Sequence, residues 1–488
     1  MLLHPLLRNA QENPSSVAII DDTGSYTNEK LVQTAMAIGA LIRAKTQKGT
    51  VGLLLPASAG FVASFYGALM VDKVPVPINF LLGPREVGHI IADSGIDTII
   101  TIPLLGARLK DLPVNIIDLE ELAKTPPPPG ATNYSPAEHQ GSDVGTILYT
   151  SGTSGLPKGV ILTHSNMHED VTASIQHAQL NQEHRFLGIV PLFHSTGMLV
   201  TLLAPTTLGA RVIFCGRFSP VGTIQKIREH QITVMAGVPS MYGALCRLKD
   251  ASSRDMDQMY AALSGGEPLP SKIREAFAAR FGKPLLEGYG LTETIAPVAF
   301  NTPQNYRPGS VGRAIPGVEI RIESDTGQPL GRNQTGEVLI RGPMVFKGYL
   351  NLPDETAAAI TPERFFRSGD LGHVDDDGYI FITGRKKDVI IISGEKVYPR
   401  EIEELLGQHP DVAEAAVVGR RDESRGEAVV AFIVPKESQS VTEESIRAFC
   451  REQGMVNWKI PKDIFITNDL PRSPTGKVLK RELAAKLG

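Results

Sequence analysis

Residues 149–160 read Tyr-Thr-Ser-Gly-Thr-Ser-Gly-Leu-Pro-Lys-Gly-Val. The run 146–150 that leads into this segment has the β-branched and aromatic composition of a strand. Small residues after the strand let backbone amides approach an anion closely, and hydroxyl groups add donors. Lys158 supplies a point charge for phosphate. The segment therefore predicts a polyphosphate-binding loop, although it lacks the Gly-Lys-Ser/Thr ending of a Walker A loop. A plain surface turn is the alternative interpretation.

On both sides of this loop, short β-branched runs alternate with helical patterns. The candidate strands are 51–55, 98–101, 114–118, 146–150, 186–190, 210–215 and 233–237. The candidate helices are 59–71, 165–179, 221–230 and 271–281. Strand–helix alternation of this kind predicts an α/β fold with mostly parallel sheets covered by helices.

The pattern changes near residue 300. Gly, Pro and short alternating runs at 318–322, 337–340 and 379–383 predict a small antiparallel or barrel-like β unit. The last hundred residues predict a small α+β domain. Its expected strands and helices are a strand at 389–392, a helix from Arg400 that ends before Pro410, strands at 412–418 and 428–434, a helix capped by Thr442, a strand at 464–467 and a helix at 478–486.

Composition excludes several functional classes. The 488 residues carry 49 basic and 53 acidic side chains, a net charge of −4, which gives no basic surplus for nucleic acid or anionic membranes. Three scattered cysteines, Cys215, Cys246 and Cys450, predict packing in a reducing cytoplasm rather than disulfides or a metal cluster. No stretch has the roughly 18 apolar residues of a membrane span, and the N-terminus lacks the pattern of a signal peptide.

The loop resembles the phosphate loop of the adenylate-forming superfamily, which includes acyl-CoA synthetases, adenylation domains of nonribosomal peptide synthetases, and beetle luciferases. Further segments with a family resemblance follow in the family's order across nearly the whole chain. They are Pro191-Leu-Phe-His-Ser-Thr-Gly197, Gly288-Tyr-Gly-Leu-Thr-Glu-Thr294, Ser368-Gly-Asp370, Gly384-Arg-Lys-Lys-Asp-Val-Ile-Ile-Ile-Ser-Gly394, Pro399-Arg-Glu-Ile-Glu403 and Pro471-Arg-Ser-Pro-Thr-Gly-Lys477.

The resemblance implies a large N-terminal adenylation domain, residues 1–384, and a mobile C-terminal lid domain, residues 385–488, with its hinge at Lys387. The large domain would hold two helix-covered sheets and the barrel-like β unit. The implied enzyme is an AMP-forming acyl-CoA synthetase that uses ATP, Mg²⁺ and coenzyme A. It would join a carboxylate to AMP, release pyrophosphate, and then transfer the acyl group to the thiol of coenzyme A. Its small-molecule substrates would be its main partners, with a homodimer left open.

The resemblance also assigns roles to individual residues. Phosphates would be held by Thr150, Ser151, Gly152, Thr153, Ser154, Gly155 and Lys158. Adenine would lie along Gly265, Gly266, Glu267, Pro268, Gly288, Tyr289 and Gly290. Glu293 would ligate Mg²⁺, Thr292 would contact the α-phosphate, Asp370 would bind the ribose hydroxyls, and Arg385 the ribose or α-phosphate. Lys477 would bridge the carboxylate and nucleotide in adenylation, Gly394 would line a pantetheine tunnel, and His194 would position the acid.

Three departures from related patterns narrow the substrate. His194-Ser195-Thr196 has no aspartate for an amino-acid substrate, Gly288 replaces the arginine of malonate-activating members, and Ile391 replaces the hinge-strand lysine of luciferases. A medium- or long-chain fatty acid is the main expectation, with the acyl pocket near Met198, Val238 and Met241. The alternatives are an aryl or cinnamate-type acid, a fatty acyl-AMP ligase that loads a carrier protein, and, from another class, a nucleotide-binding scaffold without catalysis.

Overall fold

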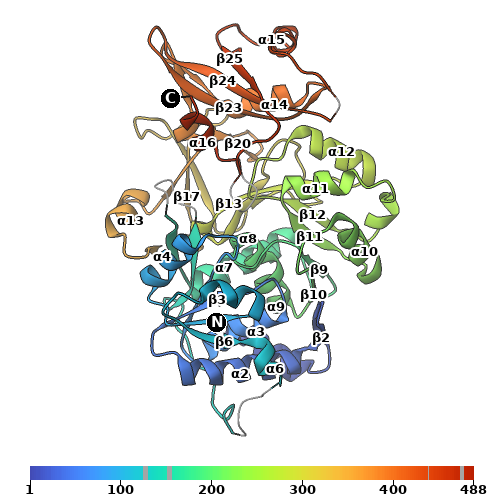
Figure 1. The fold of residues 1–488 in the computed structure, drawn as a ribbon, viewed down its shortest axis with the longest axis vertical. Coiled ribbons are helices and arrows are strands. Elements are labelled where there is room, and N and C mark those ends of the chain that lie inside the picture. Colours follow the sequence, from blue (N-terminus) through green and yellow to red (C-terminus); the bar gives the residue numbers. More distant parts are fainter. Residues whose placement is uncertain (125–129, 151–155, 438, 473–477, 488) are drawn as a thin grey trace. The chain divides into compact units, whose positions relative to one another are not determined.

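A computed structural model gives the fold and describes residues 1–124, 130–150, 156–437, 439–472 and 478–487 (Figure 1). The chain forms two compact units built from non-contiguous segments. The first unit comprises residues 1–268, 276–319 and 340–366, and the second comprises 269–275, 320–339 and 367–488. The functional boundary that the resemblance implies at residues 384 and 385 stays a prediction.

The larger sheet of the first unit has the strand order β15-β14-β13-β12-β11-β9-β10-β1-β2. Its strands are β1 Val17–Asp21, β2 Gly24–Thr27, β9 Arg185–Gly188, β10 Arg211–Phe214, β11 Val234–Gly237, β12 Ala261–Ser264, β13 Leu286–Leu291, β14 Ala296–Phe300 and β15 Arg313–Ala314. The central strands from β1 to β13 pair in parallel, whereas β2, β14 and β15 add antiparallel edges. Strands β9, β10 and β11 lie within two residues of their predicted bounds, so the parallel arrangement inferred from the sequence is confirmed.

A second sheet of four parallel strands has the order β4-β3-β5-β6. Its strands are β3 Thr50–Leu54, β4 Val74–Pro77, β5 Thr98–Thr101 and β6 Asn115–Asp118. Helix α3 (Ala59–Met70) contacts β3 and β4 of this sheet and β1 of the larger sheet. It is buried almost everywhere, which explains why it is apolar on all sides. Gly67 lets α3 approach α2 (Asn28–Lys45), because a Cβ there would lie 2.6 Å from the carbonyl oxygen of Ala35.

A third, antiparallel sheet has the order β18-β8-β7, formed by β7 Val144–Thr150, β8 Lys158–Thr163 and β18 Gly348–Tyr349. Helix α7 (His164–Ala178) follows β8, and the Thr163 hydroxyl caps it by accepting from the Asn166 backbone amide. The other helices assigned wholly to this unit are α1 Leu3–Glu12, α4 Pro84–Ser94, α5 Pro103–Gly106, α6 Leu119–Lys124, α8 Ser195–Met198, α9 Ala204–Leu208, α10 Pro220–His230, α11 Pro239–Cys246 and α13 Pro353–Ala359. Helix α12, Ser271–Phe281, has residues in both units.

The second unit contains most of a four-stranded sheet with the order β16-β17-β19-β20. Its strands are β16 Glu319–Glu323, β17 Gly336–Arg341, β19 Phe366–Val374 and β20 Ile380–Arg385. The short strands predicted at 318–322, 337–340 and 379–383 match β16, β17 and β20. The change of pattern near residue 300 therefore marks a real change from helix-covered sheets to short strands.

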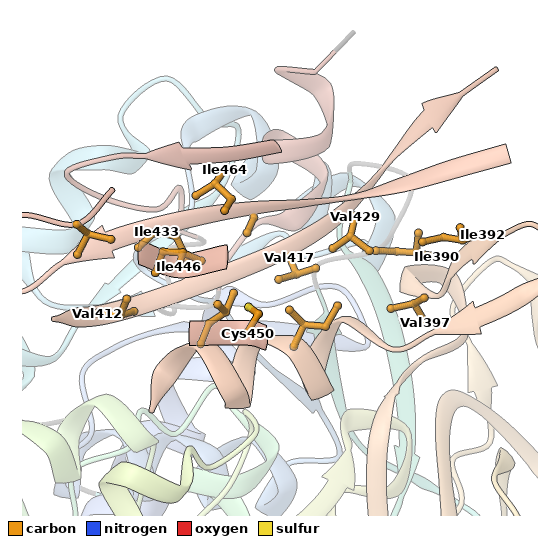
Figure 2. Packing of buried hydrophobic residues seen from close by; sticks show 14 residues of the cluster. Ile390, Ile392, Val397, Val412, Val417, Val429, Ile433, Ile446, Cys450 and Ile464 are labelled. Atoms are coloured by element: carbon orange, nitrogen blue, oxygen red, sulfur yellow. The ribbon is translucent and has the colours of Figure 1, made fainter. Parts of the chain in front are cut away.

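The C-terminal residues form a further sheet with the order β22-β21-β24-β23, in which β25 also pairs with β24. The strands are β21 Ile390–Ile392, β22 Glu395–Val397, β23 Val412–Asp422, β24 Gly426–Pro435 and β25 Asp463–Ile466, and the helices are α14 Pro399–Gly407, α15 Glu443–Glu452 and α16 Lys480–Ala485. Residues such as Val417, Val429 and Ile446 form its hydrophobic core, into which the Cys450 side chain packs (Figure 2). As the sequence predicts, Pro399 occupies the first turn of α14 and Thr442 caps α15.

The most apolar part of the chain is folded into the first unit. Residues 197–215 supply α8, the π-helical turn Leu199–Leu203, α9 and β10. Across the described ranges, no helix is both long enough and apolar enough to cross a membrane. The three cysteines have free thiols, and Cys215 and Cys450 are buried.

Candidate active site

The predicted phosphate loop joins two antiparallel strands. Strand β7 ends at Thr150, and β8 begins at Lys158, which is paired in register with Thr150. The loop residues to which the resemblance assigns phosphate contacts, 151–155, lie outside the described residues. Both ends of the loop are thus fixed by the hairpin, and Lys158 lies at the foot of the loop.

Lys158 lies in a cluster of polar side chains that the sequence did not predict. Its ammonium forms an ion pair with the carboxylate of Glu355 from α13. The same ammonium lies 5.6 Å from the centre of the Tyr349 ring, which comes from β18 beside β8. Strand pairing between β18 and β8 therefore brings residues that are distant in sequence to the lysine.

Glu293 belongs to the same cluster. It lies in the short 3-10 turn Thr292–Thr294 after β13, and its carbonyl oxygen accepts from the Phe346 amide at 2.8 Å. The Tyr349 hydroxyl donates to the Glu293 Oε1 atom, also at 2.8 Å. Burial, together with the negative charge of Glu293, raises the pKa of Tyr349 above its ordinary value. The phenol therefore remains a neutral donor that orients the carboxylate near neutral pH.

The backbone directly after Glu293 is strained. Ile295 has a φ of +59°, which is rare for a β-branched residue. Its amide donates to the Thr292 carbonyl oxygen at 3.0 Å, and the Thr294 hydroxyl accepts from the Leu291 amide at 3.1 Å. Such strain persists only where the surrounding contacts impose it, and it is concentrated at functional sites. These contacts fix the turn that presents Glu293.

The segments assigned to adenine come together at the carboxyl ends of parallel strands. Gly265 follows β12, and its amide donates to the Gly237 carbonyl oxygen at the end of β11. Strand β12 pairs with β13, which carries Gly288, Tyr289 and Gly290. A Cβ on Gly290 would lie 2.2 Å from the carbonyl oxygen of Ala296, so only glycine fits there. In open α/β sheets, ligands bind at this end of the strands.

His194 occupies the N-cap position of α8. Its amide donates to the Pro191 carbonyl oxygen at 3.1 Å, and its ring centre lies 4.7 Å from that of Phe193. The Phe193 ring in turn makes an edge contact with Phe80. Of the expected acyl-pocket residues, Met198 is fully buried, whereas Val238 and Met241 are half-buried at the start of α11.

Helix α4 supports both ends of the phosphate loop. The Asp93 carboxylate accepts from the Tyr149 hydroxyl at 2.7 Å, just before the loop. The His89 Nε2 atom lies 3.0 Å from the carbonyl oxygen of Pro157, just after it. Asn351 donates through its side-chain amide to Asp93 as well, at 2.9 Å and 3.0 Å. Sequence reasoning missed these supporting residues because no local motif marks them.

In the second unit, Asp370 and Arg385 face one another across paired strands. They are opposite each other in β19 and β20, and Arg385 Nε lies 3.2 Å from Asp370 Oδ1. Asp370 is buried, and its amide donates to the Ser368 hydroxyl at 3.0 Å. Lys387 is exposed in the 3-10 turn Lys386–Asp388. The two residues that the resemblance assigns to one nucleotide site are thus brought together in the fold.

Gly394 occupies the two-residue turn between β21 and β22. Ser393 has a φ of +51° and Gly394 a φ of +89°, as a tight hairpin with right-handed strand twist requires. A Cβ on Gly394 would meet no atom within 4 Å, so the backbone is open on that side. Lys477, to which the resemblance assigns the adenylation step, lies outside the described residues.

The residues present fit ATP and Mg²⁺. Lys158 offers a cation, and the Glu293 carboxylate, oriented by Tyr349, is the oxygen ligand that Mg²⁺ prefers. At Gly266 a Cβ would meet no atom within 4 Å, and at Gly265 only the Gly288 carbonyl oxygen at 3.6 Å, so the backbone there is open to a planar base. The open backbone at Gly394 is compatible with a narrow thiol-bearing arm such as that of coenzyme A.

Comparisons with known proteins show the family of the chain. The AMP-binding enzyme family matches residues 6–350, and the C-terminal domain of AMP-binding enzymes matches residues 401–477. A 4-coumarate-CoA ligase of Narcissus pseudonarcissus is 34% identical, over 99% of this chain and 91% of its own length. A long-chain-fatty-acid–CoA ligase of Bacillus subtilis is 31% identical, over 98% of this chain and 93% of its own. The ATP-bound MatB of Rhodopseudomonas palustris superposes with a TM-score of 0.92 at 27% identity, covering 100% of this chain and 99% of its own.

The superfamily and the fold expected from the motifs are confirmed by these matches. The same matches support an AMP-forming acid–CoA ligase that uses ATP, Mg²⁺ and coenzyme A. The alternative of a nucleotide-binding scaffold without catalysis is therefore not favoured. The family model matches residues 6–350, and relatives align with almost the whole chain. The chain therefore belongs to the AMP-binding enzyme family, the adenylate-forming enzymes.

Proposed function

We propose that this AMP-forming acid–CoA ligase activates an aryl acid of the cinnamate type. The similarity to 4-coumarate–CoA ligases over almost the whole chain carries the proposal. An aryl acid replaces the fatty acid as the first candidate substrate, because several 4-coumarate–CoA ligases match the chain at 32–34% identity over 98–99% of its length.

The surroundings of Gly288 support a compact acid. A Cβ on Gly288 would lie 3.1 Å from the Cβ of Phe300, which is opposite it in β14. Phe300 is buried, and its ring makes an edge contact with His177 at 4.6 Å between centres. The neighbour of Gly288 on β14 is therefore the aromatic side chain of Phe300 and not a small residue. We take this aromatic side chain as one wall of the proposed acid site, where edge-to-face contacts would favour a planar ring.

In the proposed first step, the residues of the first unit hold the triphosphate and its metal. Lys158 and the loop 151–155 bind the β- and γ-phosphates, Glu293 ligates Mg²⁺, and Thr292 contacts the α-phosphate. Tyr349 acts as a positioning residue, because its hydrogen bond fixes the Glu293 carboxylate. Two anions, the substrate carboxylate and the α-phosphate, must approach each other. Oriented positive charge lowers the barrier to that approach.

The remaining roles hold the nucleoside and the acid. Tyr289 stacks on adenine next to Gly266, Glu267 and Pro268, and His194 positions the acid. Asp370 accepts from the ribose hydroxyls, and its pair with Arg385 places the guanidinium beside the same sugar. Lys477 bridges the carboxylate and the nucleotide during adenylation. After adenylation, rotation about Lys387 replaces Lys477 with the loop that carries Gly394, so that the coenzyme A thiol displaces AMP.

A fatty acid remains the second candidate for the substrate. The Bacillus subtilis relative named for long-chain fatty acids is 31% identical over 98% of this chain. The free cysteines and the absence of any basic surplus support a cytoplasmic location for either version of the enzyme.

Product analysis with a panel of acids tests the proposal. The enzyme would be incubated with ATP, Mg²⁺, coenzyme A and single acids, namely cinnamates, benzoates and fatty acids from acetate to long chains. We expect kcat/KM to be highest for a cinnamate-type acid, with AMP and pyrophosphate formed in step. A preference for alkyl acids would replace the aryl assignment with the fatty acid. Acyl-AMP without thioester would contradict coenzyme A as the acceptor.

A further inference from the structure

The ion pair between Lys158 and Glu355 has no place in the proposed function. The resemblance assigns Lys158 to the phosphates of ATP, yet its ammonium already contacts a carboxylate of the protein. Glu355 lies outside every motif that carries the resemblance. A carboxylate in this position repels a polyphosphate and also takes one of the donors that the phosphate would use.

Several contacts hold Glu355 in place. Helix α13 begins at Pro353, directly after the segment that pairs β18 with β8. The Thr356 hydroxyl accepts from the Tyr349 amide at 2.9 Å and donates to the Leu352 carbonyl oxygen at 2.9 Å. On the other side of Tyr349, Asn351 is bonded to Asp93 of α4. The carboxylate is therefore presented to Lys158 by a fixed helix rather than by a free surface loop.

The pair is nevertheless accessible. The side chain of Lys158 is 22% exposed and that of Glu355 43% exposed. Ion pairs that solvent reaches are weak, so an incoming phosphate group can displace the carboxylate. The Tyr349 ring that the same lysine faces connects this exchange to Glu293, because its hydroxyl donates to the Glu293 carboxylate.

We propose that Glu355 is a built-in placeholder for the nucleotide phosphates. It holds the Lys158 ammonium at the foot of the loop before ATP binds, yields it to the phosphates, and takes it back when pyrophosphate leaves. Glu355 thereby sets the affinity for ATP and pyrophosphate. This inference rests on the proposed phosphate contact of Lys158.

Direct binding measurements on the full-length enzyme test the proposal. Pyrophosphate and a non-hydrolysable ATP analogue with Mg²⁺ would be titrated by calorimetry, without acid, into wild type and Glu355→Gln. We expect both dissociation constants to fall by roughly twofold to tenfold in the variant, the range of a weak ion pair together with a lost repulsion. The difference should shrink at high salt, because screening weakens exposed charges. Equal or weaker binding in Glu355→Gln overturns the proposal.

Asp354→Asn is the matched control. Asp354 is the exposed neighbour of Glu355 on the same helix, so this change removes the same charge without touching Lys158. Its binding constants should match those of wild type. An equal gain in Asp354→Asn would mean that overall charge, rather than the pair, governs affinity, and it would overturn the placeholder role. Circular dichroism would check that each variant is folded.

A double-mutant cycle with Lys158→Ala separates this proposal from the proposed function. Lys158→Ala should weaken binding, and Glu355→Gln should then have little further effect, because the two changes act on one interaction. If Lys158→Ala leaves binding unchanged, the proposed phosphate contact of Lys158 fails and the placeholder role fails with it. If Lys158→Ala weakens binding but Glu355→Gln changes nothing, only the placeholder role fails.

Discussion

Two sets of buried ionisable groups, one in each unit, are held in opposite ways. In the second unit, Glu323 and Glu337 are 3% and 6% exposed, and both pair with Arg367. Arg321 pairs with Glu323 as well, and Lys386 with Glu337. In the first unit, both ring nitrogens of the buried His164 and the Oδ2 atom of the buried Asp170 have no hydrogen-bond partner within the described part of the chain.

This contrast shows two solutions to the cost of burying polar groups. A buried charge is tolerated when a partner compensates its lost hydration, and its energy then depends on that partner. A buried group without a partner stays neutral instead, and its energy then depends on pH. Stability of the second unit should therefore respond most to removal of cations, and stability of the first unit to changes of pH.

The largest effect is expected from Arg367→Met. The change breaks the ion pairs to both Glu323 and Glu337 and leaves each acid with a single cation. Removing one partner of a fully buried pair costs roughly 3–5 kcal/mol. The low end of that range applies here, because the Arg367 side chain is 39% exposed and each acid keeps a second cation. Denaturant unfolding would measure the loss, and hydrogen exchange of β17 and β19 would locate it. Stability within about 0.5 kcal/mol of wild type would contradict the importance of pairing in this unit.

His164 should make the first unit less stable in acid. Burial, and to a smaller extent the His139 ring whose centre lies 4.4 Å from its own, lower its pKa from about 6.5 to about 4. Between these values the unfolded chain binds the proton and the folded chain does not, so stability is lost as pH falls. The loss over the whole interval is about 3 kcal/mol. His164→Leu should remove this slope, as shown by unfolding midpoints at pH 7 and pH 5, and an unchanged slope would contradict the assignment.

Asp170 should act in the opposite direction. Burial raises its pKa well above the ordinary value, so the folded state holds a proton that the unfolded state releases. Stability from this group is therefore lost as pH rises. Replacing it with the similarly sized leucine removes the unsatisfied Oδ2 atom and loses only the long hydrogen bond that Ser174 donates to Oδ1 at 3.4 Å. The change should therefore raise stability by about 1 kcal/mol. The gain should be larger at pH 9 than at pH 6, and thermal scans at both values would check this. Destabilisation at both would indicate an undetected partner.

The smallest effect is expected from Lys396→Met. Its ion pair with Asp325 joins two side chains that are each about half exposed. Exposed pairs contribute about 0.2–1 kcal/mol, and salt screens them. The change should therefore cost less than 1 kcal/mol at low salt and almost nothing at high salt. Because it also removes one cation from the second unit, this variant is the matched control for Arg367→Met.

Much of the fold was predictable because local patterns determine it. Strands β9, β10 and β11 are short apolar runs between turn signals, and the Pro399 and Thr442 positions mark the starts of α14 and α15. Local backbone preferences and the burial of one face are enough to predict such elements from sequence. The same holds for the ends of the phosphate loop, since Thr150 and Lys158 are paired within one hairpin.

The polar contacts of the site were not predictable. Lys158 and Glu355 are 197 residues apart, and Tyr149 and Asp93 are 56 apart. These pairs exist only because β18 pairs with β8 and α4 contacts β8, and both arrangements belong to the tertiary structure. The choice of acid could not be predicted from the motifs, for an energetic reason. Apolar pockets separate similar acids by only about 1–3 kcal/mol per methylene, so sequence motifs fix the reaction before they fix the acid.

Strand β18 has a consequence for how the enzyme is made. A ribosome produces β7 and β8 long before it reaches Gly348 and Tyr349, so β8 has an unpaired edge until the last third of the chain emerges. The hydrogen bond from Tyr349 to Glu293 and the contact of Lys158 with Glu355 are formed only after that strand arrives. Shortened chains that stop before residue 349 cannot assemble this cluster. The polar cluster around Lys158 is thus completed late in synthesis.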